Sequence, residues 1–224
     1  MTLIVSAMLF DLDGVLADST ASVVRAWTTW AHRVGLDPAS VVSQVHGRRA
    51  VDTIRAVGPE LDADEELEFL LGLETQNNED VYPIPGAPEL LAALPADAWA
   101  VVTSGLRPVA TARLVAAGIP LPRIMISAES VERGKPDPQG YLLGAAALGV
   151  SPEQCVVVED APAGAAAARN AGMRLLALTT THGAADLQPA DLVVPDLSHV
   201  IVSVIERTGD WAPHQGRLEI RVDR

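Results

Sequence analysis

Short apolar runs recur along this chain, and stretches with a helical spacing of apolar residues lie between them. Runs of this kind, bounded by glycine, proline or acidic residues, are typical of strands buried on both faces of a sheet. Several helical stretches are followed by a glycine, which commonly ends a helix. Strands that alternate with helices predict an α/β fold with helices on both faces of a parallel sheet. The expected strands occupy residues 3–10, 99–102, 124–126, 155–158 and 175–178, and the expected helices 108–117, 141–148 and 164–171.

The first apolar run is separated from the second by about ninety residues, too many for a single crossover helix. We therefore expect an inserted unit at residues 17–82, with the core formed by residues 1–16 and 83–224. The tail from Thr208 shows little pattern and is expected to end in an edge strand at 217–222. Apolar spacing predicts that the inserted unit consists of helices at 21–34, 38–45, 49–57 and 63–73.

The formal charge of −13 and the isoelectric point near 4.7 oppose binding to nucleic acid or to an anionic membrane, which usually depends on clustered basic residues. Cys155 is the only cysteine, so no intramolecular disulfide can form and a reducing compartment is expected. The N-terminal apolar run lacks a basic segment and stops at Asp11, which argues against a signal peptide or membrane span. We expect a cytoplasmic protein that is a monomer or a weak dimer.

Acidic residues follow two of the expected strands: Asp11 and Asp13 the first, and Glu159 and Asp160 the fourth. Ligands of open parallel sheets bind at the carboxyl ends of the strands, where these residues stand. An aspartate is already ionised at neutral pH and can attack phosphorus without a base to activate it. Carboxylate oxygens also suit Mg²⁺, which removes the repulsion between an aspartate and a phosphate. The pattern predicts Mg²⁺-dependent chemistry on a small phosphorylated metabolite.

Two further motifs fit the same chemistry. Thr103, Ser104 and the backbone N–H of Gly105 follow the second strand and can hold phosphate oxygens. Lys135, the single lysine beside fifteen arginines, can place a point charge next to the nucleophile and the phosphate. Each motif alone is common in turns, helix caps and surface loops. The prediction rests on their order, because all four fall in sequence within an alternating α/β pattern.

The four motifs together resemble those of the haloacid dehalogenase-like hydrolases, over residues 8–180. The resemblance implies a Rossmann-like core, a helical cap inserted after the first motif, an aspartyl-phosphate intermediate and Mg²⁺. It assigns Asp11 as nucleophile and metal ligand, and Asp13 as acid/base and as a ligand through its backbone carbonyl. Asp160 is then a ligand that Glu159 assists through water, and Thr103 and Lys135 complete the catalytic set. The motifs are Asp11-Leu12-Asp13-Gly14-Val15-Leu16-Ala17-Asp18-Ser19, Thr103-Ser104-Gly105, Gly134-Lys135-Pro136-Asp137-Pro138 and Val158-Glu159-Asp160-Ala161-Pro162-Ala163-Gly164.

Other members of the family fit less well. The dehalogenases need neither the second aspartate nor a metal, and the phosphonate-cleaving members use a cap lysine that this chain lacks. Mutases similar to β-phosphoglucomutase carry a histidine ten residues after the acid/base aspartate, where this chain has Val23, and they also use a cap lysine. These differences favour water as the acceptor and hence hydrolysis. A phosphosugar mutase, a phosphoglycolate phosphatase and a non-enzymatic metabolite sensor remain alternatives.

Segments 45–54 and 94–105 are similar to the yeast-type glycerol-3-phosphatases and 2-deoxyglucose-6-phosphatases. The resemblance favours a small substrate such as glycerol phosphate, a hexose or hexitol phosphate, or a 2-deoxy sugar phosphate. His46, Arg48 and Arg49 are expected to contact its hydroxyls or phosphate, and Gly47 to let the cap backbone come close. The alternative is an exposed helix start with solvated arginines.

Overall fold

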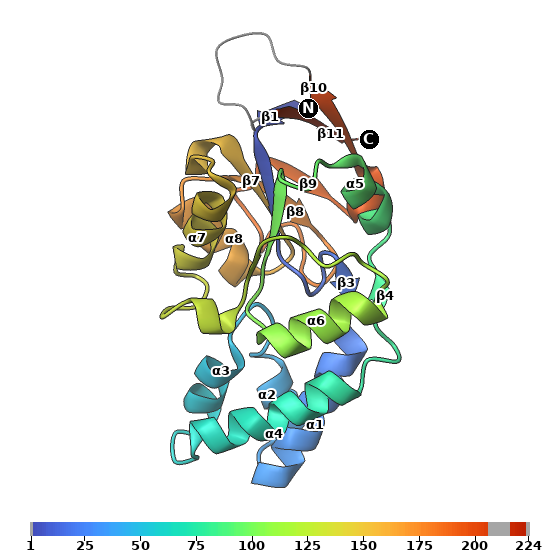
Figure 1. Cartoon of the computed structure of the whole chain (residues 1–224). Coiled ribbons are helices and arrows are strands. Elements are labelled where there is room, and N and C mark those ends of the chain that lie inside the picture. The colour runs from blue at the N-terminus through green and yellow to red at the C-terminus, as the bar shows by residue number, and fades with distance from the viewer. Residues whose placement is uncertain (1, 206–215, 223–224) are drawn as a thin grey trace.

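The structure, a computed structural model, describes residues 2–205 and 216–222. Its core is a six-stranded parallel sheet in the order β6-β5-β2-β7-β8-β9, which confirms the predicted α/β fold (Figure 1). The last strand in this order was not predicted. The strands are β2 (Ala7–Phe10), β5 (Trp99–Val102), β6 (Met125–Ile126), β7 (Cys155–Glu159), β8 (Arg174–Leu178) and β9 (Leu192–Val194).

Helices cover both faces of this sheet. Side chains alternate between the faces of each strand, so Met8 and Phe10 join one apolar cluster while Ala7 and Leu9 join the other. The first cluster packs against α5 (Ala87–Ala93) and α6 (Arg107–Ala116), and the second packs against α7 (Gln139–Leu148) and α8 (Pro162–Asn170). Burial on both faces explains why these strands are apolar except at two ends, Glu159 of β7 and Arg174 of β8.

The N-terminal run is two strands rather than the single predicted one. The chain breaks at Ser6, whose N–H donates to the carbonyl of Gln154 at 2.7 Å. β1 (Thr2–Val5) leaves the main sheet and pairs antiparallel with β11 (Arg217–Val222), which also pairs with β10 (Val200–Ile205). The strand predicted at 217–222 is therefore confirmed, but it is central rather than at an edge. Residues 208–215 and 223–224 of the predicted tail lie outside the described residues.

A second, helical unit extends beyond the carboxyl ends of the parallel strands, at the end of the molecule opposite the termini (Figure 1). We call this unit the cap. Its helices pack around their own apolar cluster, which includes Trp27, Trp30 and Leu70. They are α1 (Thr20–Val34), α2 (Pro38–Val42), α3 (Ala50–Val57) and α4 (Ala63–Gln76).

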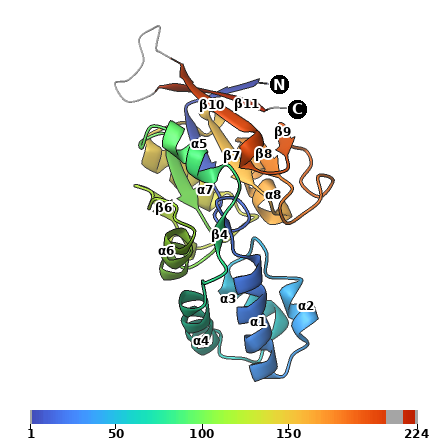
Figure 2. The same cartoon turned by 90° about the vertical axis from the view of Figure 1, so that its right-hand side faces the viewer.

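The cap joins the core through two short strands. β3 (Ala17–Asp18) and β4 (Tyr82–Pro83) pair antiparallel at the two ends of the predicted insertion. α4 of the cap packs against α6 of the core, as both views show (Figures 1 and 2). Within the described part of the chain, none of the helices has both the length and the hydropathy needed to cross a membrane.

Candidate active site

The predicted site residues converge because of the order of the strands. β2 lies between β5 and β7, so the residues that follow these three strands meet at one edge of the sheet. Gly14 turns the chain away behind Asp11 with a φ of 77°, in the left-handed region that favours glycine. A Cβ atom on Gly14 would also lie 2.0 Å from Oδ2 of Asp160. Only glycine therefore lets the first loop pass so close to Asp160.

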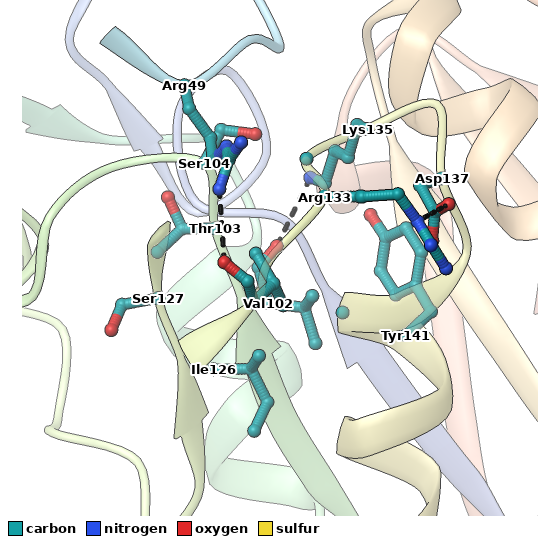
Figure 3. Close-up of a pocket in the computed structure, with 13 residues that line it drawn as sticks. Arg49, Val102, Thr103, Ser104, Ile126, Ser127, Arg133, Lys135, Asp137 and Tyr141 are labelled. Atoms are coloured by element: carbon teal, nitrogen blue, oxygen red, sulfur yellow. Dashed lines mark hydrogen bonds and ion pairs between the residues drawn. The ribbon is translucent and has the colours of Figure 1, made fainter. Parts of the chain in front are cut away.

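Lys135 connects the carboxylates of two strand ends. Its Nζ donates to Oδ1 of Asp11 and to Oε1 of Glu159, both at 2.7 Å, and to the carbonyl oxygen of Val102 at 3.2 Å. Figure 3 shows the lysine pointing from the loop before α7 towards the end of β5 at Val102. Its buried ammonium group therefore has three acceptors: Val102 and Glu159, the last residues of β5 and β7, and Asp11, which directly follows β2.

Glu159 is fully buried, and its carboxylate accepts four hydrogen bonds from the protein. Oε1 accepts from Lys135 and from the hydroxyl of Tyr141, each at 2.7 Å. Oε2 accepts from the backbone N–H groups of Asp160 and Ala161 at 3.0 and 3.2 Å. A Cβ atom on Gly164 would lie 1.6 Å from Oε1, so the start of α8 requires glycine there. Tyr141 was not predicted, because its hydroxyl group meets Glu159 only in the folded chain.

The site is electrostatically strained by an excess of negative charge. Burial raises the pKa of Asp11 to about 7, against the lowering effect of Lys135 and with further raising by Glu159 and Asp13. Burial, Glu159 and Asp11 raise the pKa of Asp160 well above its usual value. Burial alone would lower the pKa of Lys135, but Asp11 and Glu159 outweigh it, so the pKa is raised. The lysine stays charged and cannot balance the carboxylates by itself.

A divalent cation fits this charge excess. Asp11, Glu159 and Asp160 each offer a carboxylate oxygen within 4.8 Å of the others, and all three side chains are buried. Oδ2 of Asp160 accepts hydrogen bonds from Thr180, at 3.4 Å, and from Thr181. Oδ2 of Asp11 and Oδ1 of Asp160 have no hydrogen-bond donor among the described residues. Hard oxygen ligands of this kind suit Mg²⁺. The two threonines, which position Asp160, were not predicted.

The Asp13 carboxylate lies apart from this cluster. Oδ1 accepts a hydrogen bond from the Ser19 hydroxyl at 2.6 Å, and Oδ2 accepts one from Nη1 of Arg113 at 2.9 Å. Arg113 was not predicted, although the sequence carries a signal for it. The arginine falls on the apolar stripe of α6, beside Ala110 and Leu114, where a charged residue needs a buried partner.

A cleft between the cap and the core opens onto Asp11 and Asp13. The predicted residues His46, Gly47 and Arg48 line it from the cap, opposite Ser104 and Gly105 from the core. Its lining comprises Asp11, Asp13, Val23, Trp27, Val45, His46, Gly47, Arg48, Ala50, Glu74, Ser104, Gly105, Leu106 and Arg113.

Arg49 does not line this cleft, unlike its neighbours in the sequence. Its guanidinium group pairs with Asp52 at 2.7 and 2.9 Å and donates to the carbonyl oxygen of Val131 at 3.0 Å. Arg49 thus connects the cap to the loop that carries Lys135, in a smaller adjacent pocket where it lies beside Ser104 (Figure 3).

Two contacts join the cap to the core near the cleft. The Ser104 hydroxyl donates to the carbonyl oxygen of Gly47 at 3.1 Å, so the core and the cap touch beside the cleft. His46 of the cap faces His182 of the core with ring centroids 6.2 Å apart, and burial together with His182 lowers the pKa of His46. His182 was not assigned to the site from the sequence. Thr103 accepts a hydrogen bond from the N–H of Gly105 at 3.0 Å, which fixes the loop after β5.

Comparisons with known proteins show the family of the chain. Residues 8–178 match the family model described as haloacid dehalogenase-like hydrolase. The chain is 44% identical to hexitol phosphatase A of Escherichia coli (strain K12), over 87% of this chain and 93% of the relative. It is 36% identical to glycerol-1-phosphate phosphohydrolase 2 of Saccharomyces cerevisiae, over 81% and 77%. A solved hydrolase from Pseudomonas syringae superposes with a TM-score of 0.78 at 25% identity, covering 86% of this chain and 94% of that one.

Proposed function

The chain belongs to the haloacid dehalogenase-like hydrolases and is a phosphatase of that family, and we propose that it hydrolyses a small sugar or polyol phosphate through an aspartyl phosphate on Asp11. The observation that carries the proposal is the setting of the Asp11 carboxylate. It stands at the end of the central strand, holds a hydrogen bond from Lys135, and lines the cleft under the cap. The printed names of the relatives, a hexitol phosphatase and a glycerol-1-phosphate phosphohydrolase, support the substrate class.

In the proposed reaction, a carboxylate oxygen of Asp11 attacks phosphorus and the bond to the leaving alcohol oxygen breaks. Asp13 donates a proton to that oxygen. It later takes a proton from the water that attacks the aspartyl phosphate, which releases inorganic phosphate and restores Asp11. The Ser104 hydroxyl and the Gly105 N–H exchange their present acceptors, Gly47 and Thr103, for phosphate oxygens that are not transferred. The Thr103 hydroxyl binds the same phosphate, and Lys135 stabilises the charge of the transition state.

Mg²⁺ would be held by Asp11 and Asp160, with the backbone carbonyl of Asp13, and would offset the charge that the substrate phosphate brings. Glu159 contributes differently in this proposal. Because its oxygens already accept four hydrogen bonds, it fixes Lys135 and reaches the metal only through water.

The cleft supports hydrolysis of a compact, polyhydroxylated ester. It is lined by the apolar side chains of Val23 and Trp27 and by the hydrogen-bonding groups of His46 and Arg48. Val23 occupies the position where the mutases resembled by this chain carry a histidine, and its side chain offers no proton-transfer group. Water is therefore the proposed acceptor of the phosphoryl group.

The test is phosphate release from hexitol, glycerol and hexose phosphates, with Mg²⁺ and with EDTA. Wild-type protein should release phosphate only with the metal. Asp11→Asn should lower kcat by about 10³-fold or more, because an amide is a poor nucleophile, while the fold survives. Substantial turnover by this variant would exclude the covalent mechanism. Asp160→Asn should mainly raise the Mg²⁺ concentration needed for activity.

A further inference from the structure

One buried arginine joins the acid/base aspartate to the cap. Arg113 lies on α6 of the core with 3% of its surface exposed. Its Nη1 donates to Oδ2 of Asp13 at 2.9 Å, and its Nη2 donates to Oε1 of Glu74 at 2.8 Å. Glu74 belongs to α4 of the cap, which packs against α6 in both views (Figures 1 and 2). A single guanidinium group thus connects one carboxylate of the core to one of the cap.

The arrangement is not the one that stability alone would favour. A buried charge is costly unless it is fully paired, and a well-packed apolar side chain often serves as well or better. Nε of Arg113 is buried without a hydrogen-bond partner among the described residues. Its neighbours on the same stripe of α6 are Val109, Ala110 and Leu114, beside which an apolar residue would pack. Arg113 therefore uses its two Nη groups for the two carboxylates, while its Nε is left without a hydrogen bond.

The orientation of Asp13 depends on two donors. Ser19, at the start of α1, binds one carboxylate oxygen, and Arg113 binds the other. Two donors from different elements fix the plane of the carboxylate. Arg113 is in turn held by Glu74, so a displacement of α4 relative to α6 would move the guanidinium group that Asp13 depends on.

We propose that Arg113 is a positioning residue that orients the Asp13 carboxylate for proton transfer, and that Glu74 couples this orientation to the position of the cap. The proposal rests on the proposed phosphatase function, in which Asp13 is the acid. The contacts from Glu74 through Arg113 to Asp13 then link substrate binding under the cap to the orientation of the Asp13 carboxyl group.

The proposal predicts a dependence on the leaving group. An alkyl phosphate releases a strongly basic alkoxide and needs the proton of Asp13, whereas p-nitrophenyl phosphate releases a stable phenolate and does not. kcat/KM covers the steps up to release of the alcohol, so it isolates this proton transfer from hydrolysis of the aspartyl phosphate. Loss of orientation should lower kcat/KM for the alkyl ester alone.

The experiment compares wild type with Arg113→Met, Arg113→Lys and Glu74→Gln on the best alkyl phosphate and on p-nitrophenyl phosphate. For Arg113→Met, we expect kcat/KM to fall about 30-fold or more with the alkyl ester and less than about threefold with the aryl ester. Arg113→Lys should retain part of the kcat/KM for the alkyl ester, because lysine keeps the positive charge but lacks the two Nη groups that bind Asp13 and Glu74 together. Equal losses on both esters would overturn the proposal.

Arg25→Met is the matched control, because Arg25 also pairs with a carboxylate, Asp80, but at an exposed position of the cap. Both kcat/KM values should stay within about twofold of wild type. If circular dichroism shows that Arg113→Met does not fold, the nearly isosteric variant Glu74→Gln tests the proposal instead. Its ratio of kcat/KM with the alkyl ester to kcat/KM with the aryl ester should fall about fivefold, and an unchanged ratio would overturn the proposal. Wild-type protein without metal-dependent release from either ester would instead overturn the proposed function itself.

Discussion

Among single residues, Asp11 shows most directly how burial and charge compete in this site. Asp11 is 4% exposed, and the burial alone favours the protonated form of its carboxyl group. Lys135 favours the ionised form through a 2.7 Å hydrogen bond, but Glu159 and Asp13 act against it. The resulting pKa of about 7 places the proposed nucleophile between its two forms near neutral pH. A bound cation would favour the ionised form, which is the one that attacks phosphorus.

This balance gives a prediction for the metal-free protein. The pKa of Asp11 is raised from 3.8 to about 7 by folding, so the folded state binds more protons than the unfolded state between those values. The contribution of Asp11 to the free energy of unfolding should therefore fall as pH rises through that window. Mg²⁺ competes with the proton, so its stabilising effect should grow over the same window.

Thermal unfolding with and without Mg²⁺, at about pH 5 and about pH 8, measures this effect. The increase in Tm caused by Mg²⁺ should be clearly larger at the higher pH. Asp11→Asn is the control, because an amide does not titrate and the Asp11 part of the difference should disappear. An equal increase at both pH values in wild type would show that metal and proton do not compete at Asp11.

At the scale of elements, the cap contacts the core through the loop between α2 and α3, in which one position requires glycine. Gly47 has a φ of 73°, and a Cβ atom there would lie 2.9 Å from Cβ of Ala161, next to the acidic loop after β7. Its carbonyl oxygen accepts the hydrogen bond from Ser104. Gly47 therefore contacts the core loops that follow β5 and β7, rather than only leaving room for a ligand.

We expect Gly47→Ala to impair catalysis more than stability, because the added methyl group would push the cap loop away from the core. kcat/KM should fall about tenfold or more, since small misplacements of site residues are costly. Gly35→Ala is a matched control: Gly35 has nearly the same φ, 75°, but nothing lies within 4 Å of an added Cβ. Both variants should lose about 1–2 kcal/mol of stability from the backbone conformation. Similar kcat/KM values for the two variants would refute a role for the Gly47 contact.

The sequence predicted elements well where their pattern was local. Strands buried on both faces are mostly apolar, and three of the four motifs stand at strand ends, so the parallel sheet and the convergence of those loops could be predicted. The break at Ser6 could not, because it depends on the carbonyl of Gln154 far along the chain. Arg113 and Glu74 were missed for the same reason: they are 39 residues apart, and their pairing exists only after α4 packs on α6.

At the scale of the whole molecule, the second sheet lies far from the cleft of the candidate active site. The three-stranded sheet of β1, β11 and β10 lies at the end of the molecule opposite the cap (Figure 1). Its inner face contributes Leu3, Val5, Leu218 and Ile220 to the same apolar cluster as Phe10, which precedes Asp11. β11 therefore packs against the core on the side away from the cap and contributes no residue to the cleft.

This separation predicts that Leu218→Ala lowers stability without lowering activity. Leu218 is 1% exposed, and removal of such a side chain should cost about 2–5 kcal/mol through lost burial and the cavity that remains. Ile4→Ala is the control on the outer face of the same sheet: Ile4 is 48% exposed, and its truncation should cost less than about 1 kcal/mol. Urea unfolding measures both costs, and kcat/KM well below Tm should stay within about twofold of wild type for each variant. A large loss of kcat/KM in folded Leu218→Ala would mean that the second sheet positions the loops of the site as well as stabilising the core, because the effect would have to reach Asp11 through β2.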